Sequence, residues 1–237
     1  MNKTIHQVSL NSSTITRILA MAAFLLIAAS IAGQISKFMF GVDGFKSLIR
    51  LFNVDEERNI PTYFTMLLMM IIVALLGLIT ILNSNLKSPY VMQWAVLFSG
   101  FLYMAYDEIF QLHEKLIWPV QSMLGEHNLG VFYFAWVVPG IIVVMLIGLF
   151  MLRFLLHLPK PVRVRFLLAA AIYLGGAIGF ELIGGQHVEL HGEENLTYSM
   201  ITTIEESLEI SGLIFFIWAL LRYCEEHYQA VQLRFTP

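Results

Sequence analysis

Residues 16–37 read TRILAMAAFLLIAASIAGQISK and carry no charged residue between Arg17 and Lys37. A helix rises 1.5 Å per residue, so about 20 apolar residues cross the ~30 Å hydrocarbon core of a bilayer. The segment therefore predicts a transmembrane helix. Its Ser-Ile-Ala-Gly end resembles a signal-peptide cleavage site, but we interpret the segment as a retained span.

Five further apolar segments of similar length follow, at 61–83, 90–114, 131–155, 164–184 and 198–223. The 237-residue chain is 58% hydrophobic and 13% charged, with a mean hydropathy of +0.73. Ordinary soluble domains are about 25% charged. The sequence therefore predicts one all-α domain over residues 1–237, a polytopic bundle of about six transmembrane helices with the lipid bilayer as its surroundings.

Charge and cysteine content exclude several classes of partner and cofactor. The net charge of −3 provides no basic surface for nucleic acid. The single cysteine, Cys224, excludes a disulfide within the chain and a cysteine-rich zinc or iron–sulfur site.

The basic residues predict an orientation. If the N-terminus is cytoplasmic, nine Lys and Arg residues fall on the cytoplasmic side and five on the other. Cytoplasmic loops carry the excess of Lys and Arg, which favours an N-in, C-in arrangement, most simply in a bacterial inner membrane. Of the 17 acidic residues, only Glu225 and Glu226 then lie inside. The external face is acidic and should attract cations.

Two connecting segments predict short helices at the membrane surface. Within 44–53, Phe45, Leu48, Ile49 and Phe52 fall on one helical stripe, which is typical of an interfacial amphipathic helix. The loop at 115–130 carries Trp118 at its start and predicts a second. The acidic stretch 55–58 is interpreted as a solvated turn. Asn59 and Pro61 are expected to cap and begin the second span.

Ionisable side chains inside predicted spans are expensive and mark functional sites. On the third span, Tyr103, Asp107, Gln111 and Glu114 share one stripe, Glu108 flanks it, and His113 points elsewhere unless the helix ends early. The fifth span places Glu181 on a face with small residues, and His187 and His191 would share a face if the helix continues past Gly184 and Gly185. The sixth aligns Tyr198, Thr202, Glu205, Glu209 and Gly212, with Glu206 at the edge.

These carboxylates are predicted to lie at one depth. Asp107 and Glu181 each follow the cytoplasmic end of their span by about 17 residues, or roughly 26 Å. Glu205 and Glu209 lie roughly 10–16 Å below the outer start of theirs. Such a layer needs either a bound cation or shared protons. Carboxylates with imidazole suit iron, manganese or zinc. The predicted ligands are Asp107, Glu108, His113, Glu114, Glu181, His187, His191, Glu205, Glu206 and Glu209. A di-iron bundle would usually carry Glu-x-x-His, which is absent.

Three hypotheses follow. The first is a metal-binding site near the external face, in which Asp107, Glu181 and Glu205 act as general acid or base groups in oxidoreductase or hydrolase chemistry on a lipid-soluble substrate. The second is a cation- or proton-binding transport protein, although the inner halves of the spans lack the polar residues of a through-pathway. The third is a non-catalytic subunit or assembly factor, in a homo-oligomer or a larger membrane complex, with structural carboxylates.

Four motifs together carry a resemblance. They are Asn59-Ile-Pro61-Thr-Tyr-Phe, Asp107-Glu108 with His113-Glu114, Gly179-Phe-Glu181 with Gly184-Gly185, and Ile204-Glu205-Glu206-Ser-Leu-Glu209-Ile-Ser-Gly212. As a set, over roughly residues 50–223, they resemble a group of small bacterial multispan membrane proteins of unassigned function. The resemblance implies a six-helix membrane architecture and no particular activity.

Overall fold

A computed structural model describes residues 11–41, 46–125 and 128–228 of the chain. All regular structure within these residues is helical, which confirms the all-α prediction. The helices are α1 (Ser12–Phe40), α2 (Lys46–Phe52), α3 (Ile60–Asn85), α4 (Val91–Phe110), α5 (Ile117–Leu124), α6 (Val137–His157), α7 (Lys160–Leu174), the π-helical turn η4 (Gly175–Phe180), α8 (Glu181–His191) and α9 (Leu196–His227), with short 3-10 turns η2 (Glu114–Leu116) and η3 (Gly130–Phe132).

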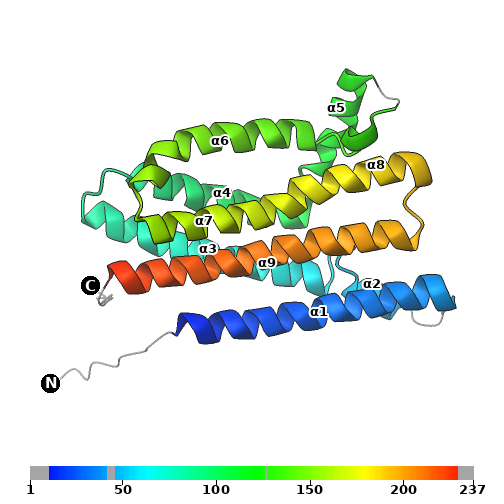
Figure 1. Ribbon diagram of the computed structural model, residues 1–237, viewed down its shortest axis with the longest axis horizontal. Coiled ribbons are helices and arrows are strands. Elements are labelled where there is room, and N and C mark those ends of the chain that lie inside the picture. Colours follow the sequence, from blue (N-terminus) through cyan, green and yellow to red (C-terminus); the bar gives the residue numbers. More distant parts are fainter. Residues whose placement is uncertain (1–10, 42–45, 126–127, 229–237) are drawn as a thin grey trace.

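The long helices run side by side in one bundle (Figure 1), and α9 is its central element because it contacts α1, α3 and α7. Helix α3 also packs along α4. Helices α7, η4 and α8 continue one another without a break, so Lys160–His191 forms one long helix. Helix α6 lies at the outside of the bundle, and α5 projects from one end (Figure 1).

Helices occupy all six predicted segments. Four of them are long and apolar enough to cross a membrane, namely Ser12–Phe40, Ile60–Asn85, Val137–His157 and Lys160–His191. This number and composition imply a lipid bilayer as the surroundings of the protein. Helices α4 and α9 run beside them in the same bundle but fall outside that set.

Several predicted boundaries differ from the structure. The segment predicted at 90–114 ends as a helix at Phe110, because Gln111 takes a left-handed conformation with φ 49°. The segment predicted at 131–155 begins only at Val137, since the 3-10 turn η3 and a bend come first. The fifth segment extends in both directions. The predicted surface helix at 44–53 is observed as α2, and residues 44–45 lie outside the described residues.

Asparagine side chains set the beginnings of three helices. Asn11 accepts a hydrogen bond from the Thr14 N–H, and Asn195 accepts one from the Tyr198 N–H. The predicted cap at Asn59 is confirmed: its Oδ1 accepts from the Thr62 N–H at 3.1 Å, and the Thr62 hydroxyl completes a capping box. These caps fix where α1, α3 and α9 enter the bundle.

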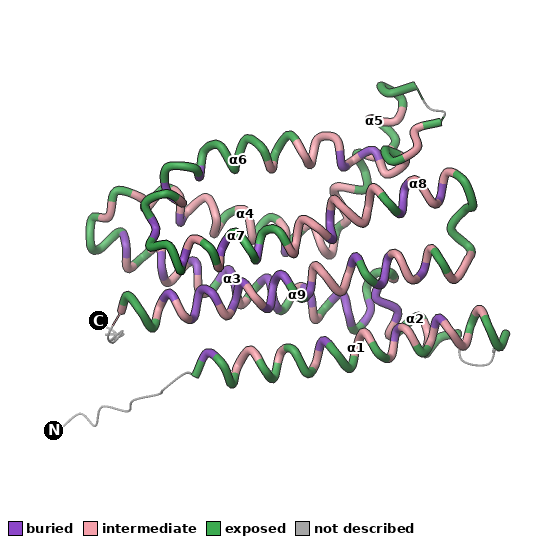
Figure 2. The backbone as a smooth tube through the Cα atoms, in the orientation of Figure 1, coloured by how far each residue is buried: buried purple, intermediate pink, exposed green. Residues whose placement is uncertain are grey.

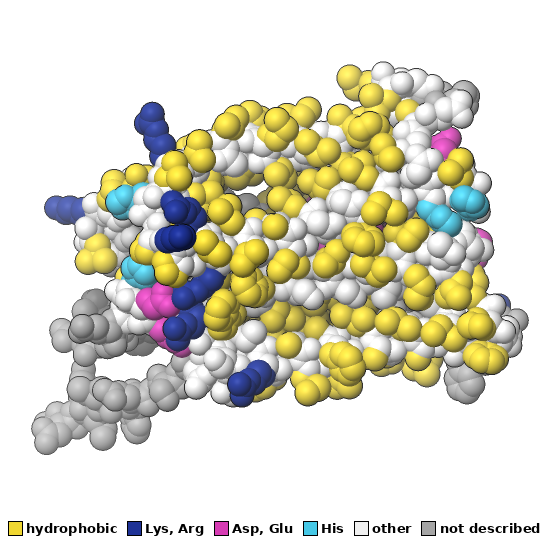
Figure 3. Space-filling model, viewed as in Figure 1, with side chains coloured by type: hydrophobic (Ala, Val, Ile, Leu, Met, Phe, Trp, Pro, Cys, Tyr) yellow, Lys and Arg dark blue, Asp and Glu magenta, His cyan; other side chains and the backbone are white. Residues whose placement is uncertain are grey.

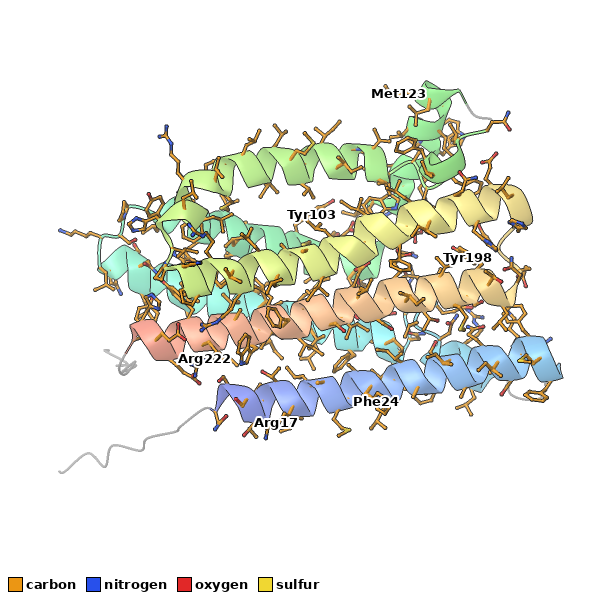
Figure 4. The ribbon with its side chains drawn as sticks, viewed as in Figure 1. Arg17, Phe24, Tyr103, Met123, Tyr198 and Arg222 are labelled. Atoms are coloured by element: carbon orange, nitrogen blue, oxygen red, sulfur yellow. The ribbon has the colours of Figure 1, made fainter. Side chains whose placement is uncertain are left out.

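The two ends of the bundle differ in charge. Arg17 near the start of α1 and Arg222 near the end of α9 lie at the same end (Figure 4), where most of the Lys and Arg side chains visible in Figure 3 gather. We call this the basic end, and the end at which α8 turns back into α9 the acidic end. At the basic end Glu225 and Glu226 pair with arginine, at 2.9 Å from Arg222 and Arg165.

Between the middle of the bundle and the basic end lies the apolar core (Figure 2). Trp94 is 1% exposed, and its ring lies 5.0 Å from both the Phe154 and the Tyr223 rings. From Ile210 onward, α9 buries large apolar residues that include Leu213, Ile217 and Leu220. The basic half of the bundle is therefore filled with apolar side chains, and the buried polar side chains of the predicted site lie in the acidic half.

Candidate functional site

Two glycines allow α9 to approach α7 and η4 closely. A Cβ atom at Gly212 would lie 2.7 Å from the backbone nitrogen of Tyr173, and one at Gly176 would lie 2.6 Å from the backbone oxygen of Glu205. Real Cβ atoms do not approach backbone so closely, so only glycine fits both positions. This contact sets the carboxyl-bearing face of α9 beside the turn that leads to Glu181.

That turn, η4, is π-helical over Gly175–Phe180. A π-turn inserts an extra residue into a helix, shifts the register of the side chains that follow, and is frequent at functional sites. Here it comes directly before Glu181. Added Cβ atoms at Gly175 and Gly179 would meet nothing within 4 Å, so the turn borders open space on the side away from α9.

Glu181 and Glu205 share a hydrogen bond between their side chains. The indole nitrogen of Trp136 donates a second hydrogen bond to Glu181 Oε1 at 2.6 Å. Glu205 is only 9% exposed. An ionised carboxylate is only an acceptor, so two carboxyl groups that are hydrogen bonded to each other need a proton on one of them. The pair therefore joins the start of α8 to α9 inside the bundle.

The early end of α4 brings His113 back to Asp107. The His113 N–H donates to Asp107 Oδ1 at 3.0 Å, and His113 Nδ1 lies 2.6 Å from Asp107 Oδ2. The His113 ring also contacts the Trp136 ring edge to face at 4.7 Å. Burial lowers the pKa of His113, but the hydrogen bond and the negative charge of Asp107 outweigh burial, and its pKa is raised. An Asp107–His113 pair thus adjoins the tryptophan that binds Glu181.

More carboxyl groups lie deeper along α9. Glu209 shares a hydrogen bond with the Tyr173 hydroxyl, and its charge acts on Glu108 of α4. Glu206 lies within electrostatic range of Glu209, Glu108 and Asp55. Residues Glu108, Glu206 and Glu209 are all half-buried. Carboxyl groups of α4 and α9 therefore lie within electrostatic range of one another.

The first loop also lies close to this region, and Asp55, Glu57 and Arg58 are exposed there, as the interpretation of a solvated turn predicts. The Asp55 carboxyl shares a hydrogen bond with buried Thr202, and burial, together with the charges of Glu56, Glu181 and Glu193, raises its pKa to about 6. Burial and Glu114 raise the pKa of Glu57, which also hydrogen bonds Gln111. The only sequence signal was the closeness of these acids to the Asn59 cap, which pins the loop against the start of α3. We call Asp55, Glu57, Glu108, Glu181, Glu205, Glu206 and Glu209 the carboxyl cluster.

The remaining predicted residues are not members of the carboxyl cluster, although the charge of Glu114 acts on Glu57 and Glu181. The helix does continue past Gly184 and Gly185, and the rings of His187 and His191 stack at 4.7 Å, but His187 Nε2 pairs with Asn195 Oδ1 at 2.9 Å. Glu114 is exposed. Tyr103 is 56% exposed on α4 and Tyr198 lies near the start of α9 (Figure 4).

Across residues 11–41, 46–125 and 128–228, no group of three or more His, Cys, Asp or Glu side chains is arranged to hold a metal ion. As they stand, the side chains bind one another and nearby hydrogen-bond donors, and the residues predicted as ligands do not form a preorganised metal centre.

A family model described as a domain of unknown function matches residues 15–224. The chain belongs to the DUF8692 family. The DUF8692 domain contains the whole carboxyl cluster, together with Trp136 and Tyr173, and it agrees with the resemblance to a family without an assigned activity. No curated protein and no solved structure matches the chain.

Proposed function

We propose that this chain is an integral membrane protein with six spans whose carboxyl cluster is an acid–base site for a lipid-soluble molecule. In this arrangement α4 and α9 cross the bilayer beside the four apolar helices. The basic end faces the cytoplasm of a bacterial inner membrane, since Lys and Arg favour that side. The acidic end and its carboxyl cluster then face outward.

The observation that carries this proposal is the hydrogen bond between Glu181 and Glu205. One proton held between two carboxyl groups can be given up or accepted as the charge of a bound molecule changes. The Trp136 indole stabilises negative charge on Glu181 through its 2.6 Å hydrogen bond. Glu181 and Glu205 are the proposed acid–base pair, with Asp107 and His113 as the adjoining proton relay.

The distribution of polar residues favours a one-sided site over a transport path. Beyond Glu209, α9 continues with buried apolar residues such as Ile210, Leu213 and Ile217. A transport path would need polar groups on both sides of the bilayer midplane. Here the apolar core lies directly on the basic-end side of the carboxyl cluster, where a path would have to continue.

Space beside α6 supports access from the bilayer. Helix α6 buries only Val137, Met151 and Phe154. Cβ atoms added at Gly148 of α6 and at Gly175 or Gly179 of η4 would meet nothing within 4 Å. A molecule dissolved in the lipid could thus approach η4, and with it Glu181, between these helices. This arrangement supports a lipid-soluble substrate.

Infrared spectroscopy of the purified protein tests the acid–base site. We expect a carbonyl stretching band from a protonated carboxyl group that disappears in both Glu181→Gln and Glu205→Gln. A Gln amide donates the missing hydrogen bond without a titrating proton, so both variants should fold. Glu194→Gln, at a side chain that is 90% exposed, is the matched control and should keep the band. A band that persists in both folded variants would rule out a shared proton at this pair.

Metal binding is the second candidate, and the acidity of the carboxyl cluster favours it. Seven carboxyl groups belong to the carboxyl cluster, and a bound cation would stabilise their charged forms. Iron, manganese or zinc would have to draw Glu108, Glu205, Glu206 or Glu209 into a new arrangement. Elemental analysis after incubation with each metal tests this: near-stoichiometric metal that is lost in a folded Glu205→Gln, Glu209→Gln variant would favour the metal site over the shared proton.

A further inference from the structure

The junction between α6 and α7 carries three cationic side chains at the basic end of the bundle (Figure 1). They are Arg153, one turn before the end of α6, and Lys160 and Arg163 in the first turn of α7. No Asp or Glu occurs in the sequence between Glu126 and Glu181. We call Arg153, Lys160 and Arg163 the α6–α7 corner, and the acid–base proposal does not use it.

The packing of the two helix ends fixes the position of the corner. Only Leu158 and Pro159 separate α6 from α7, and Leu158 is buried. Arg163 Nη1 donates to the backbone oxygen of Leu156 at 3.4 Å, so its guanidinium group folds back over the end of α6. The cations of both helices therefore belong to one compact part of the surface.

The carboxylates of the basic end are already paired with other arginines. Glu225 pairs with Arg222, and Glu226 pairs with Arg165 and Arg222. Within the part of the chain that the structure describes, the three side chains of the α6–α7 corner form no ion pair. Their positive charge is thus left for a partner from outside the chain.

The stretches that the structure does not describe supply no acidic side chain for this corner. Residues 1–10 and 229–237 contain no Asp or Glu. The acids in the other two stretches are Asp43 and Glu126, which follow α1 and α5 in the sequence. These two helices end at the opposite end of the bundle (Figure 1). The excess of positive charge at the corner therefore does not depend on residues without a described position.

The corner lies at a membrane surface. Both α6 and the long helix that begins at Lys160 are among the four helices that are long and apolar enough to cross a membrane. A junction of two residues between two such helices has to lie where both leave the hydrocarbon core. The anionic groups at this depth are the phosphates of lipids.

Each helix places one of these cations on an exposed apolar stripe. The stripe of α6 contains Arg153 together with Leu149, Leu152 and Leu156. The stripe of α7 contains Lys160 together with Val164, Leu167 and Leu168. At 100° per residue, each set spans about 100° of arc. A long cationic side chain on a lipid-facing stripe extends its charge to the interface, and the leucines beside it offer a surface to acyl chains.

We propose that the α6–α7 corner binds the headgroup of an anionic glycerophospholipid whose acyl chains lie along the two stripes. Arg153 and Lys160 bind the phosphate from the two helices, and Arg163 adds positive charge beside them. A choline headgroup fits poorly, because it brings a cation of its own to the corner. The bound lipid links α6, at the outside of the bundle, to α7. The proposal rests on the membrane-crossing helices and not on the Glu181–Glu205 pair.

Native mass spectrometry of the protein in detergent, with phosphatidylglycerol or phosphatidylcholine added, tests the proposal. We expect phosphatidylglycerol to stay bound at concentrations at which phosphatidylcholine does not. Arg153→Gln together with Lys160→Gln should weaken the apparent affinity for phosphatidylglycerol roughly tenfold or more, because two charged contacts with the phosphate are lost. Arg153→Lys together with Lys160→Arg keeps both charges and should keep most of the affinity.

The matched control is Arg17→Gln together with Lys37→Gln, which removes the same charge from exposed side chains of α1 and should keep the affinity. Glu205→Gln should also keep the lipid, so the acid–base site and the lipid site can fail separately. An equal loss of phosphatidylglycerol in the α1 variant would overturn the proposal, because overall charge alone would then explain binding. Equal retention of phosphatidylcholine by the parent would also overturn it. So would displacement of the lipid by an equal concentration of glycerol phosphate, which would make the ligand a soluble phosphate compound.

Discussion

The two halves of this bundle differ in the side chains that they bury between the helices. In the basic half, apolar residues fill the space between α3, α4, α6, α7 and α9, and the acids Glu225 and Glu226 pair with arginines at the surface. In the acidic half, Glu181 and Glu205 bind each other and an indole. The basic half gains stability from close apolar packing. The acidic half keeps polar groups at positions where apolar residues such as leucine would be more stable.

The comparison predicts that the basic half is the more sensitive one. Phe154→Ala should lower the free energy of unfolding by about 4 kcal/mol, because Phe154 is 1% exposed and its truncation leaves a cavity beside Trp94. Glu205→Gln should change it by less than about 1 kcal/mol, since the amide keeps the hydrogen bond to Glu181. Unfolding of both variants in detergent, followed by circular dichroism, provides the measurement. Equal losses would mean that the carboxyl cluster is structural.

The border between the halves is tested by glycine substitutions. Gly212→Ala should cost about 3 kcal/mol, because its Cβ would lie 2.7 Å from the Tyr173 backbone and α7 would have to move from α9. Gly179→Ala, where a Cβ meets nothing within 4 Å, is the matched control and should be neutral or slightly stabilising. Thermal unfolding distinguishes the two. A costly Gly179→Ala would argue against open space beside η4.

The smallest expected effect is a pH dependence that arises in the first loop. Burial and neighbouring carboxylates raise the pKa of Asp55 from 3.8 to about 6. The folded protein then binds more protons than the unfolded chain between these values, so stability is greatest at low pH and falls as pH rises through this range. The Asp55 residue as a whole stays exposed, and we expect a change of only about 1 kcal/mol.

Asp55→Asn should remove this part of the pH dependence, because the amide still bonds Thr202 and does not titrate. The measurement is the difference in Tm between the parent and the variant from pH 4 to pH 7, with Glu194→Gln as the control at an exposed side chain. A difference that stays constant over this range would show that Asp55 is solvated, as the sequence alone had indicated.

The positions of the helices could be predicted from the sequence because they depend mainly on local properties of the chain. Apolar runs of bilayer length predict helices, and helices occupy all six predicted segments. Asn59 with Pro61 predicted the start of α3, because an N-terminal cap depends on residues within one turn. The end of α4 at Phe110 was less predictable, since no glycine or proline marks it and Gln111 adopts a left-handed conformation.

The site was readable only in part. The stripes on α4, α8 and α9 predicted which carboxyl groups share a helix face, because helical periodicity fixes this. It does not fix which faces meet. Trp136 and Tyr173 were missed as partners of Glu181 and Glu209, since an aromatic residue in an apolar helix carries no signal of its hydrogen bond.

The sequence by itself determined a helical chain with apolar segments of bilayer length and an uneven distribution of charge, because length, composition and periodicity are local properties. Only the tertiary structure decided that the Gly176 and Gly212 contacts bring Glu181 against Glu205, that His113 folds back onto Asp107, and that Asp55 reaches Thr202. These pairings depend on the close approach of helices far apart in the chain, and no local rule specifies such contacts.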